Sequence, residues 1–377
     1  MLRFFFLTLL LTLTPATLLA SPIQTDAKQA VIVDHETGMI LFEKNAREPM
    51  PPASMTKIMT AQMVMEALEA GVLSEDMLLT VPEDAWRRGG SASGASTMFL
   101  APRSEVSVID LLRGLIIQSG NDAAITFAER LGGSEPAFAD IMTQRARELG
   151  LDTATFRNAT GWPNEEHRIS ALDLARLTGI QIERFPSYYD IYAERNFTWN
   201  GITQGNRNPL LGRFDGADGV KTGSTSVAGF GLVASAERNG VRRTVVLNGL
   251  DSQAERRRVA MELMTAAFDQ FSILELYENG LSMGEIPVYL GKSETVGLVI
   301  RENVTIPVHR SERRLLRARV DFVMPTAPIE EGAQVAELIV SKEGVEMGRY
   351  PLYASESVDR IGFFGRVATS LVEKIRG

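Results

Sequence analysis

The sequence predicts an α+β domain, an antiparallel sheet with helices, followed by a small all-β domain and a C-terminal amphipathic helix. Strand-like segments lie near both ends of the first two-thirds of the chain, with helical periodicity between them, and short β-rich segments follow. The chain has 377 residues, of which 45% are hydrophobic and 23% are charged. This composition supports a full-sized core and excludes a disordered or fibrous protein.

Charge and rare residues exclude several classes of function. The formal net charge is −8, and both ends of the chain are positive, so the body is more acidic still and a poor partner for nucleic acid. The absence of cysteine rules out disulfides, thiolate metal sites and a cysteine nucleophile. Three histidines are too few to suggest a histidine-rich metal centre.

The N-terminus has the pattern of a secretory signal peptide. An apolar run, FFFLTLLLTL at residues 4–13, follows Arg3 and precedes Pro15 and small residues up to Ala20. The run is shorter than the roughly 20 apolar residues that a spanning helix needs. We expect export and the removal of residues 1–20 as a leader, and an uncleaved anchor is the alternative.

The first domain, expected over residues 26–280, has strands at both of its ends. Near residue 31, two alternating apolar runs surround a polar turn in AVIVDHETGMILFEKN, which is the pattern of a hairpin. Asn239-Gly240 predicts a second tight turn. The later strands are expected at 217–223, 228–237 and 242–250. We expect the first and last strands to share one sheet.

Amphipathic periodicity predicts helices between these strands, notably within 105–131 and 170–183. A further helix, expected from about 252 to 276, would cover the sheet. The second domain, expected over 281–358, consists of short β-rich segments separated by Gly, Pro and charged turns. Its strands are VGLVI at 296–300, VTIPV at 304–308, LRARVDFV at 316–323 and VAELIV at 335–340. No motif in it indicates chemistry.

The last residues, 359–377, predict an amphipathic helix. Apolar side chains recur at three- and four-residue steps, and most of the basic side chains lie off that stripe. A helix at the chain end has little left to pack against, so this pattern suits an anionic membrane surface. The alternative is a helix that docks on its own protein. The apolar stripe is Ile361, Phe364, Ala368, Leu371, Val372 and Ile375, and the cations off it are Arg366, Lys374 and Arg376.

Ser54 and Lys57 form the first motif with chemical meaning. Pro51 and Pro52 keep the chain extended and apolar periodicity begins at Ile58, which places Ser54 near a helix N-terminus. A three-residue step on a helix puts both side chains on one face. A desolvated, partly neutral lysine can take the proton of a serine hydroxyl. Alone, the motif is more often an N-cap serine with a surface lysine.

Two further motifs follow. Ser119-Gly120-Asn121 lies between helical segments and predicts a loop whose hydroxyl relays protons and whose carboxamide holds a substrate peptide group. Lys221-Thr222-Gly223 ends a strand, where a cation and a hydroxyl would face a cleft and glycine permits close approach of a ligand. Each alone also fits an ordinary turn or a solvated strand end. The three motifs in one order are the evidence, since Lys-Thr-Gly alone occurs by chance in roughly one such chain in ten.

With these motifs in order, the chain resembles the serine penicillin-binding proteins and β-lactamases. It more closely resembles the D-alanyl-D-alanine carboxypeptidases of the penicillin-binding protein 5 and 6 type, from about residue 26 to 377. The resemblance includes the β-rich domain and the tail, whereas a β-lactamase normally ends after a catalytic domain of the same transpeptidase-like fold. The stretches that carry it are PASMTK, FLAPRSEVSVIDLLRGLIIQSGNDAA, FTWNGITQGNRNPLL and GVKTGSTSVAGFGLVASA.

The resemblance implies a role for each matching residue. Ser54 would be the acylated nucleophile, Lys57 its general base, and Ser119 a proton relay. The substrate-binding groups would be Asn121 for the amide, Lys221 and Thr222 for electrostatics and the terminal carboxylate, the backbone amides of Ser54 and Ser224 for the oxyanion, and Arg256 for the free carboxylate.

Three positions depart from the family pattern or leave it open. Several relatives have histidine where this chain has Ser224, so any contribution from that ring is absent or replaced. Arg257 follows Arg256 directly and is the alternative carboxylate ligand. Glu165 and Glu166 lie on a loop comparable to that of the class A β-lactamases, but neither has the asparagine that accompanies the deacylating glutamate there. We interpret both as solvated loop charges.

The resemblance implies an exported serine carboxypeptidase that removes the terminal D-alanine from peptidoglycan stem peptides ending in D-Ala-D-Ala. It would need no metal or cofactor, β-lactams would inhibit it, and the C-terminal helix would hold it at the periplasmic face of the inner membrane. A β-lactamase or an endopeptidase using the same site remains an alternative. A membrane-associated cell-wall scaffold without activity is the non-enzymatic one.

Overall fold

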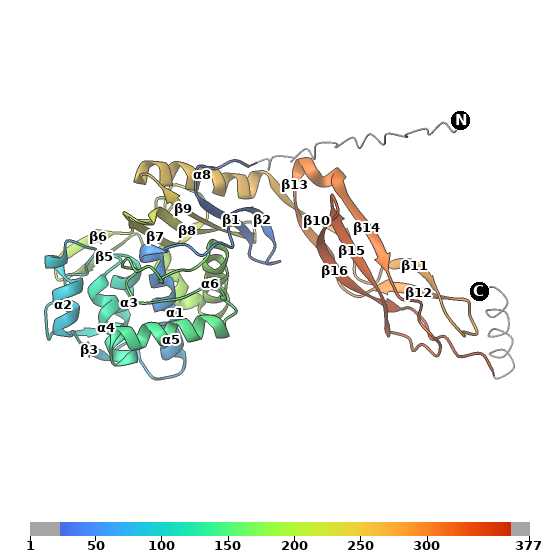
Figure 1. Ribbon diagram of the computed structural model, residues 1–377, viewed down its shortest axis with the longest axis horizontal. Coiled ribbons are helices and arrows are strands. Elements are labelled where there is room, and N and C mark those ends of the chain that lie inside the picture. Colours follow the sequence, from blue (N-terminus) through green and yellow to red (C-terminus); the bar gives the residue numbers. More distant parts are fainter. Residues whose placement is uncertain (1–22, 363–377) are drawn as a thin grey trace, which may run out of the picture.

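A five-stranded antiparallel sheet forms the centre of the first domain in the computed structural model, which describes residues 23–362 (Figure 1). Its strand order is β2-β1-β9-β8-β7, so the N-terminal hairpin pairs with the last strand of the domain, as the sequence predicts. Strand β7 is therefore an edge strand, and among the described residues only β8 pairs with it. The strands are β1 (Gln29–Asp34), β2 (Ile40–Lys44), β7 (Ala217–Thr225), β8 (Gly229–Arg238) and β9 (Val241–Leu250).

Asn239 and Gly240 form the predicted tight turn between β8 and β9. Their φ angles are 53° and 74°, the left-handed pair that a two-residue hairpin turn of type I′ requires. Asparagine tolerates this region better than most side chains and glycine adopts it freely. The turn fixes the register in which Arg238 lies opposite Val241.

The two faces of this sheet carry separate cores. Val31 and Val33 of β1 pack into the cluster on the helical side, whereas Ala30 and Ile32 point to the opposite face. That second face is covered by α8 (Gln253–Asp269), whose residues, including Leu263, complete its core. Alternation of apolar residues along β1 thus places the sheet between two layers of helix.

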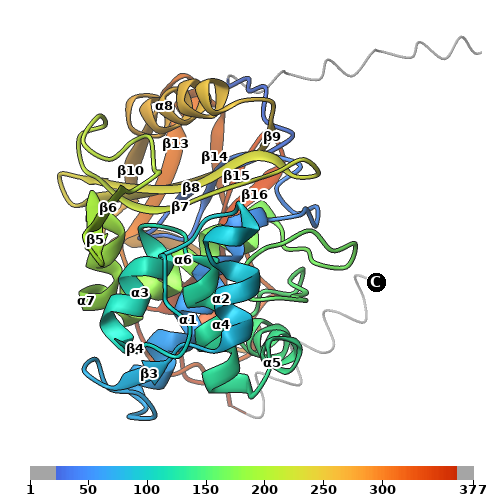
Figure 2. The same ribbon diagram turned by 90° about the vertical axis from the view of Figure 1, so that its left-hand side faces the viewer.

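The remaining helices lie together on the other side of the sheet from α8 (Figure 2). The helix α1 runs through this layer, and eight of its 13 residues are buried, which explains its apolar character on most faces. The helices are η1 (Ala53–Thr56), α1 (Lys57–Glu69), α2 (Glu83–Gly89), α3 (Val108–Ile116), α4 (Asn121–Gly132), α5 (Glu135–Glu148), α6 (Ala171–Arg184) and α7 (Pro186–Tyr189). An antiparallel pair, β3 (Leu78–Thr80) with β4 (Glu105–Ser107), and a small hairpin, β5 (Asn196–Trp199) with β6 (Ile202–Gly205), flank them.

The helix expected from 252 to 276 covers the sheet but ends earlier than predicted, at Asp269. The following residues form strand β10 (Phe271–Tyr277), which pairs with β13 (Val304–His309). The apolar residues of this segment, FSILELY, show no clean alternation, so the long-range partner decides between helix and strand. The pairing ties residues 271–277 to the second domain, so it favours a domain boundary near residue 270 over one at 280.

The second domain is all-β and projects beyond the end of α8 (Figure 1). A five-stranded antiparallel sheet with the order β11-β12-β16-β15-β14 packs with the β10-β13 pair around one apolar cluster. The four strands predicted there are present. The strands are β11 (Ser282–Pro287), β12 (Thr295–Ile300), β14 (Leu316–Asp321), β15 (Gln334–Lys342) and β16 (Val345–Ala354).

Two predicted segments lie outside the described residues: the leader over 1–20 and most of the amphipathic helix over 359–377. The described chain ends on the second domain, where Arg360 forms a bridge with Gly291. Among residues 23–362, no helix combines the length and the apolar character needed to cross a bilayer.

Candidate active site

The Ser54 hydroxyl and the Lys57 ammonium lie within hydrogen-bonding reach. Ser54 sits in the 3-10 turn η1 that leads into α1, and the Lys57 Nζ is 3.2 Å from its Oγ. Lys57 is only 1% exposed, and its Nζ also donates to Asn121 Oδ1 and to the Thr160 carbonyl, each at 2.7 Å. The first and second sequence motifs therefore meet at the lysine, as the predicted chemistry requires.

Burial changes the acidity of Lys57. Desolvation, with a smaller contribution from the positive charge of Arg207, lowers its pKa to about 7, against the opposing pull of Asp122 and Glu135. A large fraction of the lysine is neutral at neutral pH. A neutral amine 3.2 Å from a hydroxyl can accept the proton of that hydroxyl as it attacks a carbonyl.

The Ser119-Gly120-Asn121 loop joins α3 to α4 and aims its side chains inward. Ser119 has a left-handed backbone, with φ of 59°, and its buried Oγ has no hydrogen-bond partner among the described residues. The next residue, Asp122, accepts hydrogen bonds from Thr97 Oγ1 at 2.6 Å and from the Met98 amide at 2.9 Å. Asp122 therefore holds the loop in place. No local pattern marks Asp122, although it directly follows the motif.

The third motif lies on the edge strand β7 and closes the cleft. Lys221 and Thr222 are buried, at 3% and 6% exposure, whereas Ser224 is exposed. A side-chain carbon on Gly223 would stand 2.7 Å from the Pro52 carbonyl oxygen, so only glycine lets β7 lie against η1. Burial, and then the positive charges of Lys57, Arg207 and Arg256, lower the pKa of Lys221.

Arg256 and Arg207 add two more cations beside this strand. Arg256 is 7% exposed on the first turn of α8 and its guanidinium lies 5.8 Å from the Phe230 ring centroid, whereas Arg257 is exposed. This burial favours Arg256 over its neighbour as a ligand. Arg207 lines the same polar cleft and contacts Ser96 Oγ. Arg207 lies in a segment that carries the family resemblance, but no local pattern marks the arginine itself.

A loop over residues 158–162 packs against the serine turn from the other side. The Asn158 Oδ1 accepts hydrogen bonds from the amides of Gly161 and Trp162, at 2.7 and 3.1 Å, which fixes the loop from within. Gly161 has φ of +87°, and a side-chain carbon there would stand 1.8 Å from the Ala53 carbonyl oxygen. This close packing presents the Thr160 carbonyl to Lys57.

His167 contacts the serine turn η1 through Thr56. It is 2% exposed, and its Nδ1 accepts a hydrogen bond from the Arg157 amide at 3.1 Å. The proton of the neutral ring therefore lies on Nε2, which donates to Thr56 Oγ1 at 2.8 Å. Burial, and then the charges of Arg168 and Arg157, lower its pKa to about 4. No sequence motif marks this histidine.

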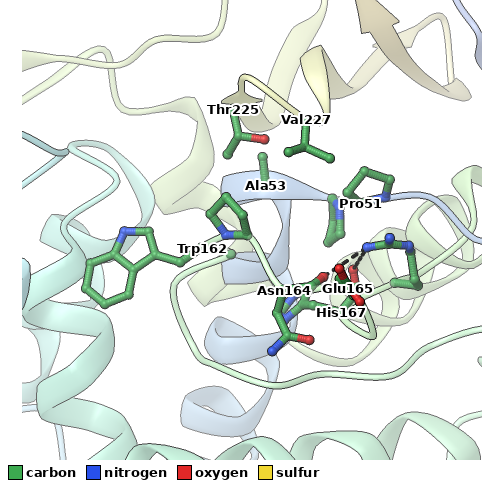
Figure 3. A pocket seen from close by; sticks show the side chains of 12 residues that line it. Pro51, Ala53, Trp162, Asn164, Glu165, His167, Thr225 and Val227 are labelled. Atoms are coloured by element: carbon green, nitrogen blue, oxygen red, sulfur yellow. Dashed lines mark hydrogen bonds between the residues drawn. The ribbon is translucent and has the colours of Figure 1, made fainter.

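A mostly apolar pocket of about 190 Å³ opens beside the serine turn (Figure 3). Its wall includes Ala53, which precedes the nucleophile, and Thr225, which ends β7. Glu165 lines this pocket, whereas Glu166 pairs with Arg157 at 2.8 Å and does not. Both glutamates are exposed, in line with solvated loop charges, but only Glu165 faces a cavity.

Together these groups can carry out acyl transfer to a serine. The hydroxyl has a buried amine beside it, an amide side chain within reach of that amine, and cations nearby to attract an anionic end of a substrate. The α+β domain and a serine with a buried lysine beside it are typical of a class of serine hydrolases.

Comparison with known proteins gives the family. The sequence model described as D-alanyl-D-alanine carboxypeptidase (peptidase S11) matches residues 16–251, and that of the penicillin-binding protein 5 C-terminal domain matches residues 271–360. D-alanyl-D-alanine carboxypeptidase DacC of Escherichia coli K12 is 36% identical over 346 residues, covering 91% of this chain and 86% of that relative. The chain belongs to the serine D-alanyl-D-alanine carboxypeptidases, penicillin-binding proteins of peptidoglycan remodelling.

Solved structures agree with this assignment. Penicillin-binding protein 5 from Haemophilus influenzae is 32% identical and superposes with a TM-score of 0.75, covering 90% of this chain and 99% of that one. The carboxypeptidase DacD from Francisella tularensis superposes with a TM-score of 0.80 at 29% identity, covering 90% and 95%. Penicillin-binding protein D2 from Listeria monocytogenes, solved in its ampicillin-bound form, is 30% identical, with a TM-score of 0.59, and covers 66% of this chain and 100% of its own.

Proposed function

We propose that the carboxypeptidase reaction proceeds through an acyl-enzyme on Ser54. The observation that carries this proposal is the buried Lys57 amine, 3.2 Å from the Ser54 Oγ and with its pKa lowered to about 7. Lys57 takes the hydroxyl proton as Ser54 attacks the carbonyl of the penultimate D-alanine. Ser119, whose hydroxyl is buried and without a partner among the described residues, passes a proton to the departing D-alanine. Water then releases the acyl group.

Substrate binding uses groups on both sides of the cleft. The backbone amides of Ser54 and Ser224 hold the developing oxyanion, because one lies at a helix start and the other on an edge strand. The side-chain amide of Asn121 holds the substrate peptide. Lys221, Thr222 and Arg256 bind the terminal carboxylate, where mutually repelling buried cations favour an anion.

Release of D-alanine from an N-acylated D-Ala-D-Ala peptide, followed by HPLC, tests the assignment. We expect the parent protein to release it and Ser54→Ala to lose this activity. Because the related Listeria protein is known in an ampicillin-bound form, fluorescent penicillin should label the parent at the same serine. Labelling of Ser54→Ala as strong as that of the parent would contradict the nucleophile. Rapid turnover of penicillin would indicate a β-lactamase. Cleavage of cross-linked dimers of the stem peptide would indicate an endopeptidase.

We also infer that the protein is exported and held at the periplasmic face of the inner membrane. The signal-like leader supports export, and the basic amphipathic pattern of residues 359–377 supports attachment to an anionic surface. The described chain ends on the second domain, so the tail would connect that domain to the membrane.

A further inference from the structure

The pocket beside Ser54 adjoins Thr225 at the end of β7, whereas Arg207 and Arg256 line a separate cleft. Strand β7 is an edge strand, and a peptide bound to it as an added antiparallel strand would place its C-terminus near Lys221 and its preceding residues near Thr225. Thr225 and Val227 form one wall of the pocket, and Ala53 forms another (Figure 3). The residue that precedes D-Ala-D-Ala would therefore pass over this pocket.

Size and lining suit one extended side chain. The volume of about 190 Å³ is below the roughly 300 Å³ at which pockets for whole drug-sized ligands begin. The walls come from Pro51, Pro52, Pro163 and Val227, whose rings and methyl groups would contact methylenes. A side chain of several methylenes would fill the space without burying an unpaired polar atom.

Two opposite charges also line this pocket. Glu165 forms no ion pair within 4 Å among the described residues, and neither does Arg168. The Arg168 Nη1 donates only to the carbonyls of Asn164 and His167, both at 3.0 Å, so its charge is not compensated by a carboxylate. His167 is neutral because its pKa is about 4. A carboxylate and a guanidinium without counter-ions complement a group that carries both an ammonium and a carboxylate.

We propose that this pocket binds the side chain of the stem-peptide residue that precedes D-Ala-D-Ala, and that this side chain is an alkyl chain ending in an amino acid head group. Glu165 receives the ammonium, Arg168 receives the carboxylate, and the proline-rich wall contacts the methylenes. The inference rests on the proposed acyl-enzyme reaction at Ser54 and adds a specificity determinant to it.

Three peptides of the form N-acetyl-X-D-Ala-D-Ala test this preference. The residue X is norleucine, lysine or diaminopimelic acid, so that its side chain ends in a methyl group, an ammonium, or an ammonium with a carboxylate. We expect kcat/KM for release of D-alanine to rise in that order, by about threefold or more at each step, because the exposed ion pairs are individually modest. Equal kcat/KM for all three would overturn the inference.

Charge-removing variants assign the two head-group contacts. Glu165→Gln should lower kcat/KM about three- to fivefold for the lysine and diaminopimelic acid peptides and leave the norleucine peptide unchanged. Glu166→Gln is the matched control, since Glu166 is the next residue but pairs outside the pocket, and should leave all three unchanged. Arg168→Gln should lower kcat/KM only for the diaminopimelic acid peptide. Arg168→Lys keeps the charge and should retain most of the parent kcat/KM for that peptide.

Filling the pocket provides an independent readout. Val227→Trp should lower kcat/KM for all three peptides about tenfold but spare N-acetyl-Gly-D-Ala-D-Ala, whose third residue has no side chain. Ser226 is exposed and outside the pocket, so Ser226→Trp should change none of the four. If the parent protein releases D-alanine from no peptide, the proposed reaction fails. If the parent protein releases D-alanine but Val227→Trp changes kcat/KM by the same factor for all four peptides, only the pocket inference fails.

Discussion

A buried amine is the central feature at the scale of single residues. Lys57 is surrounded by a hydroxyl, a carboxamide and a carbonyl, none of which carries a negative charge. Burial in such a site costs the protonated form more than the neutral form, so the neutral amine becomes available near neutral pH. In the proposed mechanism, this neutral amine is the base for the Ser54 hydroxyl 3.2 Å away, and no histidine is needed for that proton transfer.

The acidity of Lys57 predicts a pH profile. If the neutral amine is the base, kcat/KM should rise with pH through an apparent pKa of about 7. Arg207 lowers that pKa through its positive charge, so Arg207→Gln should move the rising limb to higher pH, whatever its effect on the plateau. The exposed Arg257→Gln is the control and should leave the limb in place. A limb that stays near pH 7 in Arg207→Gln would contradict this electrostatic role.

His167 predicts a pH dependence of stability. Its pKa is about 4 in the folded protein and about 6.5 in the unfolded chain, so the unfolded chain binds the proton first as pH falls. The free energy of unfolding should therefore drop by about 2 kcal/mol between pH 7 and pH 5, as measured by urea denaturation. His167→Gln offers a donor to Thr56 and an acceptor to the Arg157 amide without titrating. It should lose that part of the pH dependence.

The sequence could predict the residues of the site that belong to local motifs but not those that act across the fold. Ser54 with Lys57 and the Ser119 loop were recognisable because each lies within a short pattern. Arg207 and His167 were not, because their partners are far away in the chain: Arg207 reaches Ser96, and His167 reaches Thr56. Only the folded chain brings such pairs together.

At the scale of elements, close backbone packing shapes the cleft. The serine turn η1 is held between Gly223 of β7 and Gly161 of the 158–162 loop, and neither contact leaves room for a side chain. At both positions a Cβ atom would clash with a backbone carbonyl oxygen of the serine turn or of the residue before it, so only glycine fits. Sequence patterns predicted the five strands of the central sheet and four strands of the second domain, but the end of α8 depended on the pairing of β10 with β13, which no local pattern specifies.

Gly161 should be intolerant of substitution for this reason. Gly161→Ala would place a carbon 1.8 Å from the Ala53 carbonyl, in addition to straining a backbone with φ of +87°. We expect loss of D-alanine release by tenfold or more, because the loop and the serine turn must move apart. Gly38→Ala has similar strain, with φ of +68°, but meets no atom within 4 Å. It should retain activity at a stability cost of about 1 kcal/mol, and similar activity losses in the two variants would argue against the packing explanation.

A buried ion pair joins β1 to β9 and predicts a stability effect. Asp34 and Arg243 face each other across the two strands, at 0% and 2% exposure. Arg243→Met would leave a buried carboxylate without its counter-ion and should lower the free energy of unfolding by roughly 3–5 kcal/mol. Adding Asp34→Leu should recover much of this loss in urea denaturation. Arg258→Met, which breaks exposed ion pairs with Asp26, Glu255 and Glu262, should change stability by less than about 1 kcal/mol.

At the scale of the whole molecule, the second domain separates the cleft from the end of the chain. The site residues lie in the first domain, on β7 and in the helical layer, and the described chain ends on the second domain, where Arg360 forms a β-bridge with Gly291. The second domain projects away from the helical layer (Figure 1). An anchor after residue 362 would therefore hold the active site away from the membrane surface. Composition and periodicity predicted the two-domain order, whereas the projecting arrangement depends on contacts between domains.

The proposed anchor predicts lipid-dependent binding that follows the last 15 residues. A chain truncated after Gly362 keeps the bridge between Arg360 and Gly291 and the pairing of Val358 with Ile329, so the second domain stays intact. In sedimentation with vesicles, we expect the mature full chain to bind vesicles containing phosphatidylglycerol and to bind purely zwitterionic vesicles much more weakly. The truncated protein should bind neither and should release D-alanine at the parent rate. Binding of the truncated protein to anionic vesicles at the parent level would assign membrane contact to the described domains and overturn the anchor.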